Sequence, residues 1–288
     1  MKQSTFNVTG IKSILHALAG IAIFVASAGI ASMVYFFVPQ GIIATVLSTV
    51  INISLLYASL ALYCKNILHI PLKECRVRKP KALFMWLACS IILPIAVSAF
   101  FICLTPGEFS IPQLASADLR NQIFSAIFGA CITAGITEEL VFRGFIMRIL
   151  EARWGKLPAI LFPSLVFGLL HLTSITEPNM RDVLLLTIAG TSVGAMFSMV
   201  AYHSGSIWPS AIMHGIWNLV IVGGIVNIGV THNGTNLICY TLRSRSELLT
   251  GGSFGIESSA PATISYLLVF LLAFVLNKKE NRPRHTSP

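Results

Sequence analysis

Long apolar runs recur from one end of this 288-residue sequence to the other, and they constrain its fold more than any other feature. A helix needs about 17–25 mainly apolar residues to cross a bilayer. Eight such runs can be read along the chain, at residues 14–38, 41–63, 82–104, 122–149, 157–173, 183–203, 207–230 and 261–277. The sequence therefore predicts an all-α fold, a polytopic membrane helix bundle with about eight transmembrane helices.

The arrangement of these runs indicates a single domain. The runs at 157–173 and 261–277 are the shortest, and we expect them to be tilted or partly re-entrant. The stretch 231–260 is polar and rich in Gly and Ser, and it is the one segment long enough to form a sizeable external loop. No internal repeat is evident. We therefore expect one integral membrane domain over residues 1–288, with its motif-bearing core at 122–230.

Charge supports the membrane interpretation and orients the chain. Only 11% of the residues are charged, whereas a soluble domain would carry roughly a quarter. The net charge of +9 could indicate a nucleic-acid partner. However, most of the 20 Lys and Arg residues lie before the first run, after the second and fourth, and after the eighth. This placement points to anionic lipid instead, and it predicts that the N and C termini are cytoplasmic.

Three charged side chains stand inside the fourth apolar run, in the stretch ITEELVFRGF at residues 136–145. They are Glu138, Glu139 and Arg143. An ionised glutamate facing lipid at the bilayer centre would cost roughly 2.5–3.5 kcal/mol or more, so these residues must face protein or water. Glu139 precedes Arg143 by four residues, the favourable order for a helical ion pair. Glu138 points about 100° away, which leaves one carboxyl group free for chemistry.

Two later runs carry polar side chains at the same helical spacing. Phe167 and His171 are four residues apart near the end of the fifth run. His214 and Asn218 are four residues apart in the seventh. Two histidines, an asparagine and a free glutamate match a general base, an assisting imidazole and donors to an oxyanion. The set Glu138, His171 and His214 could also hold zinc, so a metal site stays open as the alternative to a site without a cofactor.

Other motifs are set aside. The HExxH helix of zincin-type metalloproteases is absent from the sequence. GTSVG at 190–194 fits GxSxG, but it lies inside a continuous apolar run with no turn that would expose Ser192. We interpret it as small residues that let helices pack closely. The six cysteines form no CxxC pair, which argues against a zinc knuckle or a disulfide framework.

The three motifs together resemble a known family. EExxxR at 138–143, FxxxH at 167–171 and HxxxN at 214–218 occur in this order on successive apolar runs. The pattern resembles the type II CAAX prenyl endopeptidase and bacteriocin-processing (CPBP, or ABI) family of intramembrane proteases. The resemblance is sharp over residues 138–218 and only architectural elsewhere.

The resemblance implies a role for each motif residue. It implies that the catalytic residues are the polar members of the motifs, Glu138, His171, His214 and Asn218. It implies that the supporting residues are Glu139, Arg143 and Phe167. The free glutamate would activate water with help from the first histidine, while the second histidine and the asparagine would form the oxyanion site. No metal is essential in this scheme.

On this basis we expect an intramembrane endopeptidase that cleaves a peptide or membrane-protein substrate near the bilayer, with no nucleic-acid partner. The short loops favour a bacterial cell membrane and a role in peptide maturation, immunity or regulated proteolysis. In a eukaryote, the endoplasmic reticulum membrane and prenylated substrates would be expected. The sequence leaves the oligomeric state open. The alternatives are a proton-coupled transporter that uses Glu138 as a relay, and a non-catalytic immunity protein on the same fold.

The predicted topology contains one conflict. His171 falls near the outer end of its span, whereas Glu138 and His214 fall nearer the middle or the cytoplasmic half. A short, tilted or displaced fifth span would bring these three side chains together.

Overall fold

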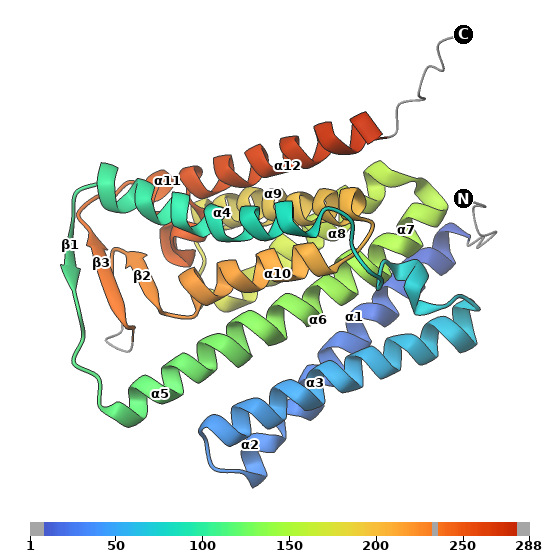
Figure 1. Cartoon of the computed structure of the whole chain (residues 1–288), viewed down its shortest axis with the longest axis horizontal. Coiled ribbons are helices and arrows are strands. Elements are labelled where there is room, and N and C mark those ends of the chain that lie inside the picture. The colour runs from blue at the N-terminus through green and yellow to red at the C-terminus, as the bar shows by residue number, and fades with distance from the viewer. Residues whose placement is uncertain (1–8, 232–235, 281–288) are drawn as a thin grey trace.

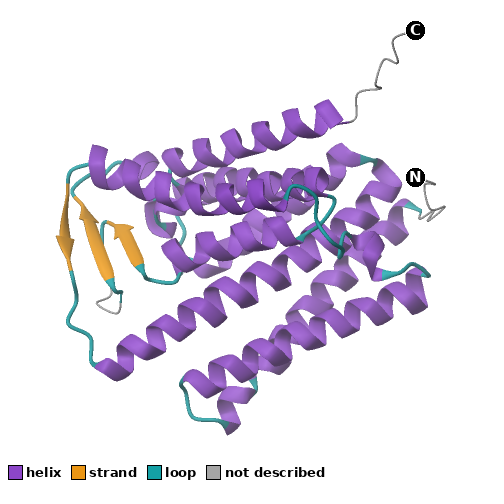
Figure 2. Cartoon of the chain, viewed as in Figure 1, coloured by secondary structure: helices purple, strands orange, loops and turns teal. Residues whose placement is uncertain are grey.

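The computed structural model describes residues 9–231 and 236–280, and most of this part of the chain is helical (Figures 1 and 2). Seven of its helices are long and apolar enough to cross a membrane: Gly10–Phe37, Ile42–Leu68, Leu83–Leu104, Ser116–Trp154, Lys156–Ser174, Met180–Ser204 and Ala260–Glu280. A shorter apolar helix, Trp208–Val222, follows the sixth. The prediction of an all-α polytopic membrane bundle is confirmed, and the chain is an integral membrane protein.

These helices divide into shorter elements. The first comprises α1 (Gly10–Ser32) and α2 (Val34–Phe37), and the second comprises α3 (Ile42–Tyr63) and the π-helical turn η1 (Cys64–Leu68). Four others are α4 (Leu83–Leu104), α8 (Lys156–Leu170) continued by the 3-10 turn η5 (His171–Ser174), α9 (Met180–Ser204) and α12 (Ala260–Glu280). Many large apolar side chains on their outward faces remain exposed, as helices that face lipid require.

The longest helix runs diagonally through the bundle, between the α1–α3 pair and the group formed by α4, α9 and α12 (Figure 1). It consists of α5 (Ser116–Phe124), η3 (Ser125–Ala134), α6 (Gly135–Glu139), η4 (Leu140–Ile146) and α7 (Met147–Trp154). The segments η3 and η4 are π-helical. This helix therefore carries the EExxxR motif at the centre of the molecule.

The two runs expected to be short, 157–173 and 261–277, are the shortest of the seven spans, at 19 and 21 residues. The helix expected at 207–230 is shorter still, which was not predicted. It consists of α10 (Trp208–Trp217) and the π-helical turn η6 (Asn218–Val222). It ends because Gly223 and Gly224 follow, and Gly224 adopts a φ of +74° that favours glycine.

A small three-stranded sheet caps one end of the bundle (Figure 2) and was not predicted from the sequence. Its strands are β1 (Gly107–Ser110), β2 (Val226–Gly229) and β3 (Ile238–Leu242), in the order β1-β3-β2. β3 is antiparallel to β1 and parallel to β2. Strands of four or five residues are too short to give a clear alternating pattern.

The expected loop 231–260 is therefore partly structured. It contains β3, the helix α11 (Glu247–Thr250) and the 3-10 turns η7 (Gly252–Phe254) and η8 (Ile256–Ser258). Residues 232–235 of this loop lie outside the described residues. So do Lys2, Arg282 and Arg284, which contributed to the predicted orientation of the termini.

Helices α8 and α9 approach each other through small residues. A Cβ on Gly190 would lie 2.5 Å from the Cα of Gly168, and a Cβ on Gly194 would lie 2.7 Å from the Cβ of Ser164. Only glycine fits at these two positions of α9. The hydroxyl of Ser192 donates to the carbonyl of Ile188 within the helix. The interpretation of GTSVG as a packing motif, rather than a serine nucleophile, agrees with this geometry.

Candidate active site

The two motif glutamates lie on α6, a five-residue α-helical segment between the π-helical stretches η3 and η4. Single π-helical turns are frequent at functional sites, and here they flank the acidic pair on both sides. Gly135 at the start of α6 packs directly on α10. A Cβ there would lie 2.8 Å from the carbonyl oxygen of Ala211 and 3.0 Å from the Cα of Gly215. This close approach holds α6 against the helix that carries His214.

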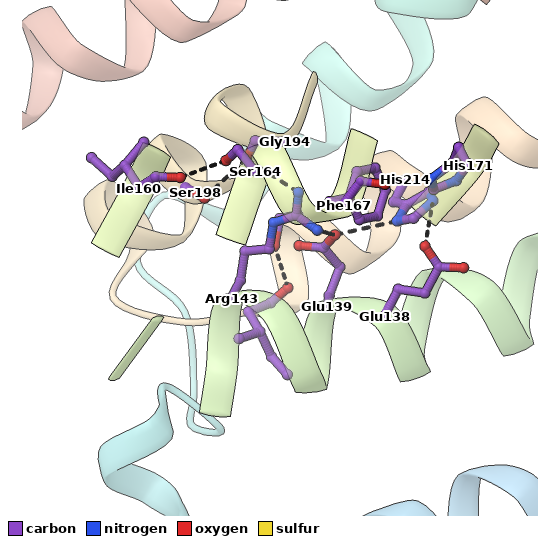
Figure 3. Close-up of polar contacts among 12 residues, drawn as sticks. Glu138, Glu139, Arg143, Ile160, Ser164, Phe167, His171, Gly194, Ser198 and His214 are labelled. Carbon is purple, nitrogen blue, oxygen red and sulfur yellow. Dashed lines mark hydrogen bonds and ion pairs between the residues drawn. The ribbon is translucent and has the colours of Figure 1, made fainter. Parts of the chain in front are cut away.

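Arg143 and Glu139 form a fully buried ion pair (Figure 3). Nη1 of Arg143 donates to Oε1 of Glu139 over 2.8 Å, and the two side chains are 1% and 0% exposed. Nη2 donates to the carbonyl of Gly194 on α9 over 3.2 Å. The guanidinium also lies 4.5 Å from the ring centroid of Phe167 and 5.2 Å from that of Phe197. The ion pair expected from the spacing is present, and its arginine connects three helices.

Glu139 makes a second contact that sequence reasoning missed. The same Oε1 accepts from Nδ1 of His214 over 3.2 Å. Because an ionised carboxylate paired with Arg143 can only accept, Nδ1 of His214 must carry a hydrogen. Nε2 on the other side of the ring then faces Glu138, at 3.9 Å from Oε2 (Figure 3). A chain of three side chains, Arg143–Glu139–His214, therefore fixes the orientation of the imidazole.

Glu138 remains without such a partner. Its side chain is 19% exposed, and its Oε2 makes no hydrogen bond with any described residue. The side chain lines a pocket of about 310 Å³ together with Phe142, Phe167 and His171, opposite residues of α1 such as Ile21. This pocket is called the Glu138 pocket below. The separation of the two glutamates into one paired and one free carboxyl group matches the sequence expectation.

His171 lies where α8 changes into the 3-10 turn η5. Its Nδ1 lies 2.8 Å from the carbonyl oxygen of Phe167, so Nδ1 donates and Nε2 is left free. The rings of Phe167 and His171 are 4.6 Å apart, and Phe167 also makes an edge contact with His214 at 5.9 Å. The FxxxH motif therefore places an aromatic ring beside both histidines. The conflict in the predicted topology is resolved, because Glu138 and His171 line one pocket.

Asn218 stands at the junction of α10 and the π-helical turn η6. Its Nδ2 donates to the carbonyl oxygen of Ala130 in η3 over 3.1 Å. The second hydrogen on Nδ2 remains available. Asn218 lines a second, smaller cavity together with His171 and His214. The HxxxN pair thus lies on one face of α10, as its spacing predicted.

The second cavity, called the histidine cavity below, meets the Glu138 pocket at Phe167 and His171, which line both. Three further residues of its wall were missed by sequence reasoning: Phe254, Glu257 and Tyr266. They lie in the turns η7 and η8 and in α12. The sequence pattern indicates functional residues where polar side chains lie inside apolar runs. Phe254 and Glu257 instead lie in the Gly- and Ser-rich segment between two runs.

The positions of Glu138, His171 and His214 can be compared with the geometry that zinc requires. Among the described residues, no group of three or more His, Cys, Asp or Glu side chains is placed to hold one metal ion. Two ligands of one tetrahedral zinc, each at about 2.0–2.2 Å, lie closer together than the 3.9 Å between Glu138 and His214. The Nδ1 atoms of both histidines bind protein acceptors, which leaves the Nε2 atoms as the nitrogens that could bind a metal. No step of the chemistry below is assigned to a metal.

Comparison with known families identifies the centre of the chain. Residues 120–220 match the family model described as Rce1-like, type II CAAX prenyl endopeptidase Rce1-like. The motif-based recognition is confirmed. The matched range begins in α5, contains every motif residue and ends just after Asn218. At the family level, the Rce1-like match supports a CAAX-protease-like membrane peptidase and implies a peptide or protein substrate.

The matched range covers about a third of the chain and leaves out the sheet and the turns η7 and η8. No curated protein and no solved structure matches the chain. Phe254 and Glu257 lie outside the range of the Rce1-like match.

Proposed function

We propose that this protein is an intramembrane endopeptidase in which Glu138 activates water for attack on a peptide bond. The observation that carries the proposal is the free Oε2 of Glu138, which lies 3.9 Å from Nε2 of His214 in a pocket shared with His171. This separation is too long for a direct hydrogen bond and suits a bridging water. Glu139 and Arg143 are occupied with each other, so Glu138 is the carboxyl group left to act.

The reaction assigns each proton. Glu138 takes a proton from water while the oxygen attacks the peptide carbonyl carbon, with Nε2 of His171 accepting a hydrogen bond from the same water. The protonated glutamic acid then gives its proton to the leaving nitrogen as the C–N bond breaks. The products are a free carboxyl group and a free amine, and Glu138 returns to its initial state.

His214 and Asn218 are proposed to stabilise the oxyanion of the tetrahedral intermediate. His214 lies between the carboxylates of Glu138 and Glu139, and an imidazole that carries a hydrogen on each ring nitrogen donates from both. Nε2 can then donate to the oxyanion while Nδ1 stays bound to Glu139. Asn218 can donate the amide hydrogen that Ala130 does not use. Donors fixed in a dry site in this way contribute strongly to catalysis.

The route to the site supports a substrate that arrives from the bilayer. The Glu138 pocket shares Ile21 and Phe142 with an apolar groove of about 560 Å³ between α1, α7 and α8. The groove is lined by apolar side chains such as Leu18, Leu150 and Phe162. An apolar segment of a peptide or membrane protein can lie there with its scissile bond beside Glu138. We propose peptide maturation, immunity or regulated proteolysis in a bacterial membrane as the biological role.

Comparative peptidomics of membranes tests the proposal. Membranes that contain the wild-type protein, Glu138→Gln or the control Glu177→Gln are incubated and their released peptides compared. Glu177 is an exposed glutamate between η5 and α9, so its replacement changes the charge without touching the site. Peptides made by the wild type and the control but missing with Glu138→Gln are expected. The same peptides with folded Glu138→Gln would show that the mechanism is wrong.

Metal dependence is tested in the same membranes. We expect the Glu138-dependent peptides to persist after exhaustive chelation, since no three ligands are placed around one metal among the described residues. Loss of cleavage on chelation, restored by zinc, would replace this mechanism with a metal-assisted one.

A further inference from the structure

One wall of the histidine cavity is formed by Phe254 and Glu257 of residues 251–259, called the strap below. The strap is fixed at its start by Asp182 on α9, whose carboxylate accepts from the backbone N of Ser253 at 2.8 Å and from its hydroxyl at 2.9 Å. Asp182 is itself held by a capping box with Asn179 at the N-terminus of α9. The first turn of the strap is thus attached to a buried, hydrogen-bonded carboxylate.

The end of the strap is held as firmly. The hydroxyl of Ser258 donates to the carbonyl of Gly251 over 2.6 Å and closes the loop on itself. The hydroxyl of Tyr266 on α12 donates to the backbone carbonyl of Glu257 over 3.2 Å. Phe254 and Glu257 are therefore held as a wall of the histidine cavity, with the ring of Phe254 6.1 Å from that of His171.

The Glu257 side chain is only half satisfied by protein. Its Oε2 accepts from Nε1 of Trp217 over 3.0 Å, and the other oxygen, Oε1, has no hydrogen-bond partner among the described residues. The carboxyl group lines the same cavity as His171, His214 and Asn218. Trp217 ends α10 and Asn218 follows it at the start of η6, so the residue bound to Glu257 is next in the chain to a proposed oxyanion donor.

The charges around the two pockets do not balance. Glu139 is paired with Arg143, whereas neither Glu138 nor Glu257 forms an ion pair with a lysine or arginine among the described residues. Burial raises the pKa of the Glu257 carboxyl above its ordinary value, against the smaller opposing effects of the Trp217 hydrogen bond and of His171 and His214. A buried carboxylate is stabilised when a cation enters beside it.

The size of the histidine cavity restricts what can enter. The space that the centres of water molecules can occupy is about 50 Å³. Since one water needs roughly 10–15 Å³ of such space, the histidine cavity can hold a few water molecules. An ammonium group is about as large as a water molecule, whereas a guanidinium is a wide planar fork with five donors. The cavity therefore suits an ammonium group better than a guanidinium.

We propose that Glu257 is a substrate-binding residue whose free carboxylate oxygen receives an ammonium group of the substrate next to the scissile bond. This inference rests on the proposed endopeptidase function and names the substrate class of the same site. The ammonium group can come from a lysine side chain or from a free peptide N-terminus. Either source supplies a positive charge beside Glu257, which has no lysine or arginine partner among the described residues.

Cleavage by Glu257→Gln tests the proposal directly. Glutamine keeps an oxygen that accepts from Trp217, so the wall is preserved while the charge is removed. In the peptidomic comparison, Glu138-dependent sites are expected to have a lysine or a free N-terminus at a fixed distance from the cut. Glu257→Gln should cleave these sites roughly 10–100-fold more slowly, the effect of losing a hydrogen bond between charged groups, while Glu177→Gln cleaves normally. Unchanged rates in Glu257→Gln, or sites without an ammonium group, would overturn the proposal.

A binding experiment keeps the proposal testable if no cleavage is found. The probes are Nα-acetyl-lysine methylamide for the side-chain source, glycine amide for the N-terminal source, and Nα-acetyl-norleucine methylamide as the neutral match. Each is added at millimolar concentration to the purified full chain in lipid nanodiscs, and the midpoint of thermal unfolding is measured.

At least one ammonium probe is expected to raise this midpoint in the wild type and in Glu177→Gln, and not in Glu257→Gln. The norleucine probe should leave all three alike. Equal shifts in all three proteins, or none in the wild type, would contradict the ammonium subsite. Identical peptides from the wild type and Glu138→Gln would instead contradict the endopeptidase function, so the two failures are distinct.

Discussion

The histidine cavity has two walls that the chain builds in different ways. One wall, formed by His171, His214 and Asn218, comes from membrane helices and is backed by the buried pair Glu139–Arg143. The other wall, formed by Phe254 and Glu257, comes from the strap, which is held by hydrogen bonds to Asp182 and Tyr266 and by Ile256 in the hydrophobic core. The first wall lies within the range of the Rce1-like match, and the second lies outside it.

The difference between the two walls implies that they have different functions. Helices fixed by close glycine contacts and a buried ion pair hold catalytic groups at constant distances, which chemistry requires. A loop tied by a few hydrogen bonds can change its sequence without disturbing those distances. We therefore expect changes to the helical wall to alter the rate for every substrate, and changes to the strap to alter which substrate is used.

The largest effect is expected at Glu138. Replacing it by Gln removes the proposed base but keeps the shape of the side chain, and general-base catalysis contributes roughly 10²–10⁴-fold. The rate of peptide release in reconstituted lipid vesicles measures this loss, with Glu177→Gln as the control. If Glu138→Gln lost its activity only because its unfolding midpoint had also fallen, the glutamate would be structural. The contrast between the two walls would then fail.

The next largest effect is expected at Arg143, and on stability. Arg143→Met leaves Glu139 as an uncompensated buried charge, and breaking a buried pair costs about 3–5 kcal/mol. The unfolding midpoint in detergent or nanodiscs should fall accordingly. Arg78, an exposed arginine before α4, provides the matched control Arg78→Met, although its loss removes one hydrogen bond to Gly205. A midpoint for Arg143→Met no lower than that of Arg78→Met would show that the buried pair does not hold the helical wall.

Asn218→Ala should act on the rate more than on the fold. Removing one oxyanion donor costs about 10²–10³-fold in kcat. KM should change little, because the interaction forms in the transition state. Loss of the bond to Ala130 adds a smaller cost in stability. Single-turnover and steady-state kinetics separate these effects, and a raised KM at unchanged kcat would assign Asn218 to substrate binding instead.

The smallest effect is expected at the strap anchor. Ser253→Ala removes the hydroxyl donor to Asp182 and keeps the backbone donor, and one such hydrogen bond contributes about 0.5–1.5 kcal/mol. Hydrogen exchange of residues 251–259 should quicken while exchange in α6 and α10 stays unchanged. Faster exchange throughout the bundle would show that the strap and the helices form one cooperative unit, and the two walls would no longer be distinct.

The helical wall could be read from the sequence because its information is local. Spacing in a 3.6-residue helix separates Glu138 from the Glu139–Arg143 pair and places His214 and Asn218 on one face. The positions of the membrane spans could also be predicted, because each span is a continuous apolar run in the sequence. The contact between His214 and Glu139 joins residues 75 apart in the chain, and no local pattern predicts it.

The strap wall could not be read in this way. Glu257 lies among Gly and Ser residues, where no period shows which way a side chain points. Its position depends on Asp182 and Tyr266, which belong to two other helices. The early end of α10–η6 also depends on the sheet that follows Gly224, because β2 pairs with β3 rather than continuing the helix.

The π-helical stretches η3 and η4 have a consequence for how this sequence can vary over evolutionary time. A π-helical turn holds more residues than an α-helical turn, so deleting a single residue there can restore an ordinary helix. Such a deletion would change the helical phase of the flanking segments little. A deletion within the α-helical segment α6 would instead rotate the residues on one side of it by about 100° relative to the other. Homologous chains should therefore keep the length of residues 135–139, whereas η3 and η4 can lose a residue.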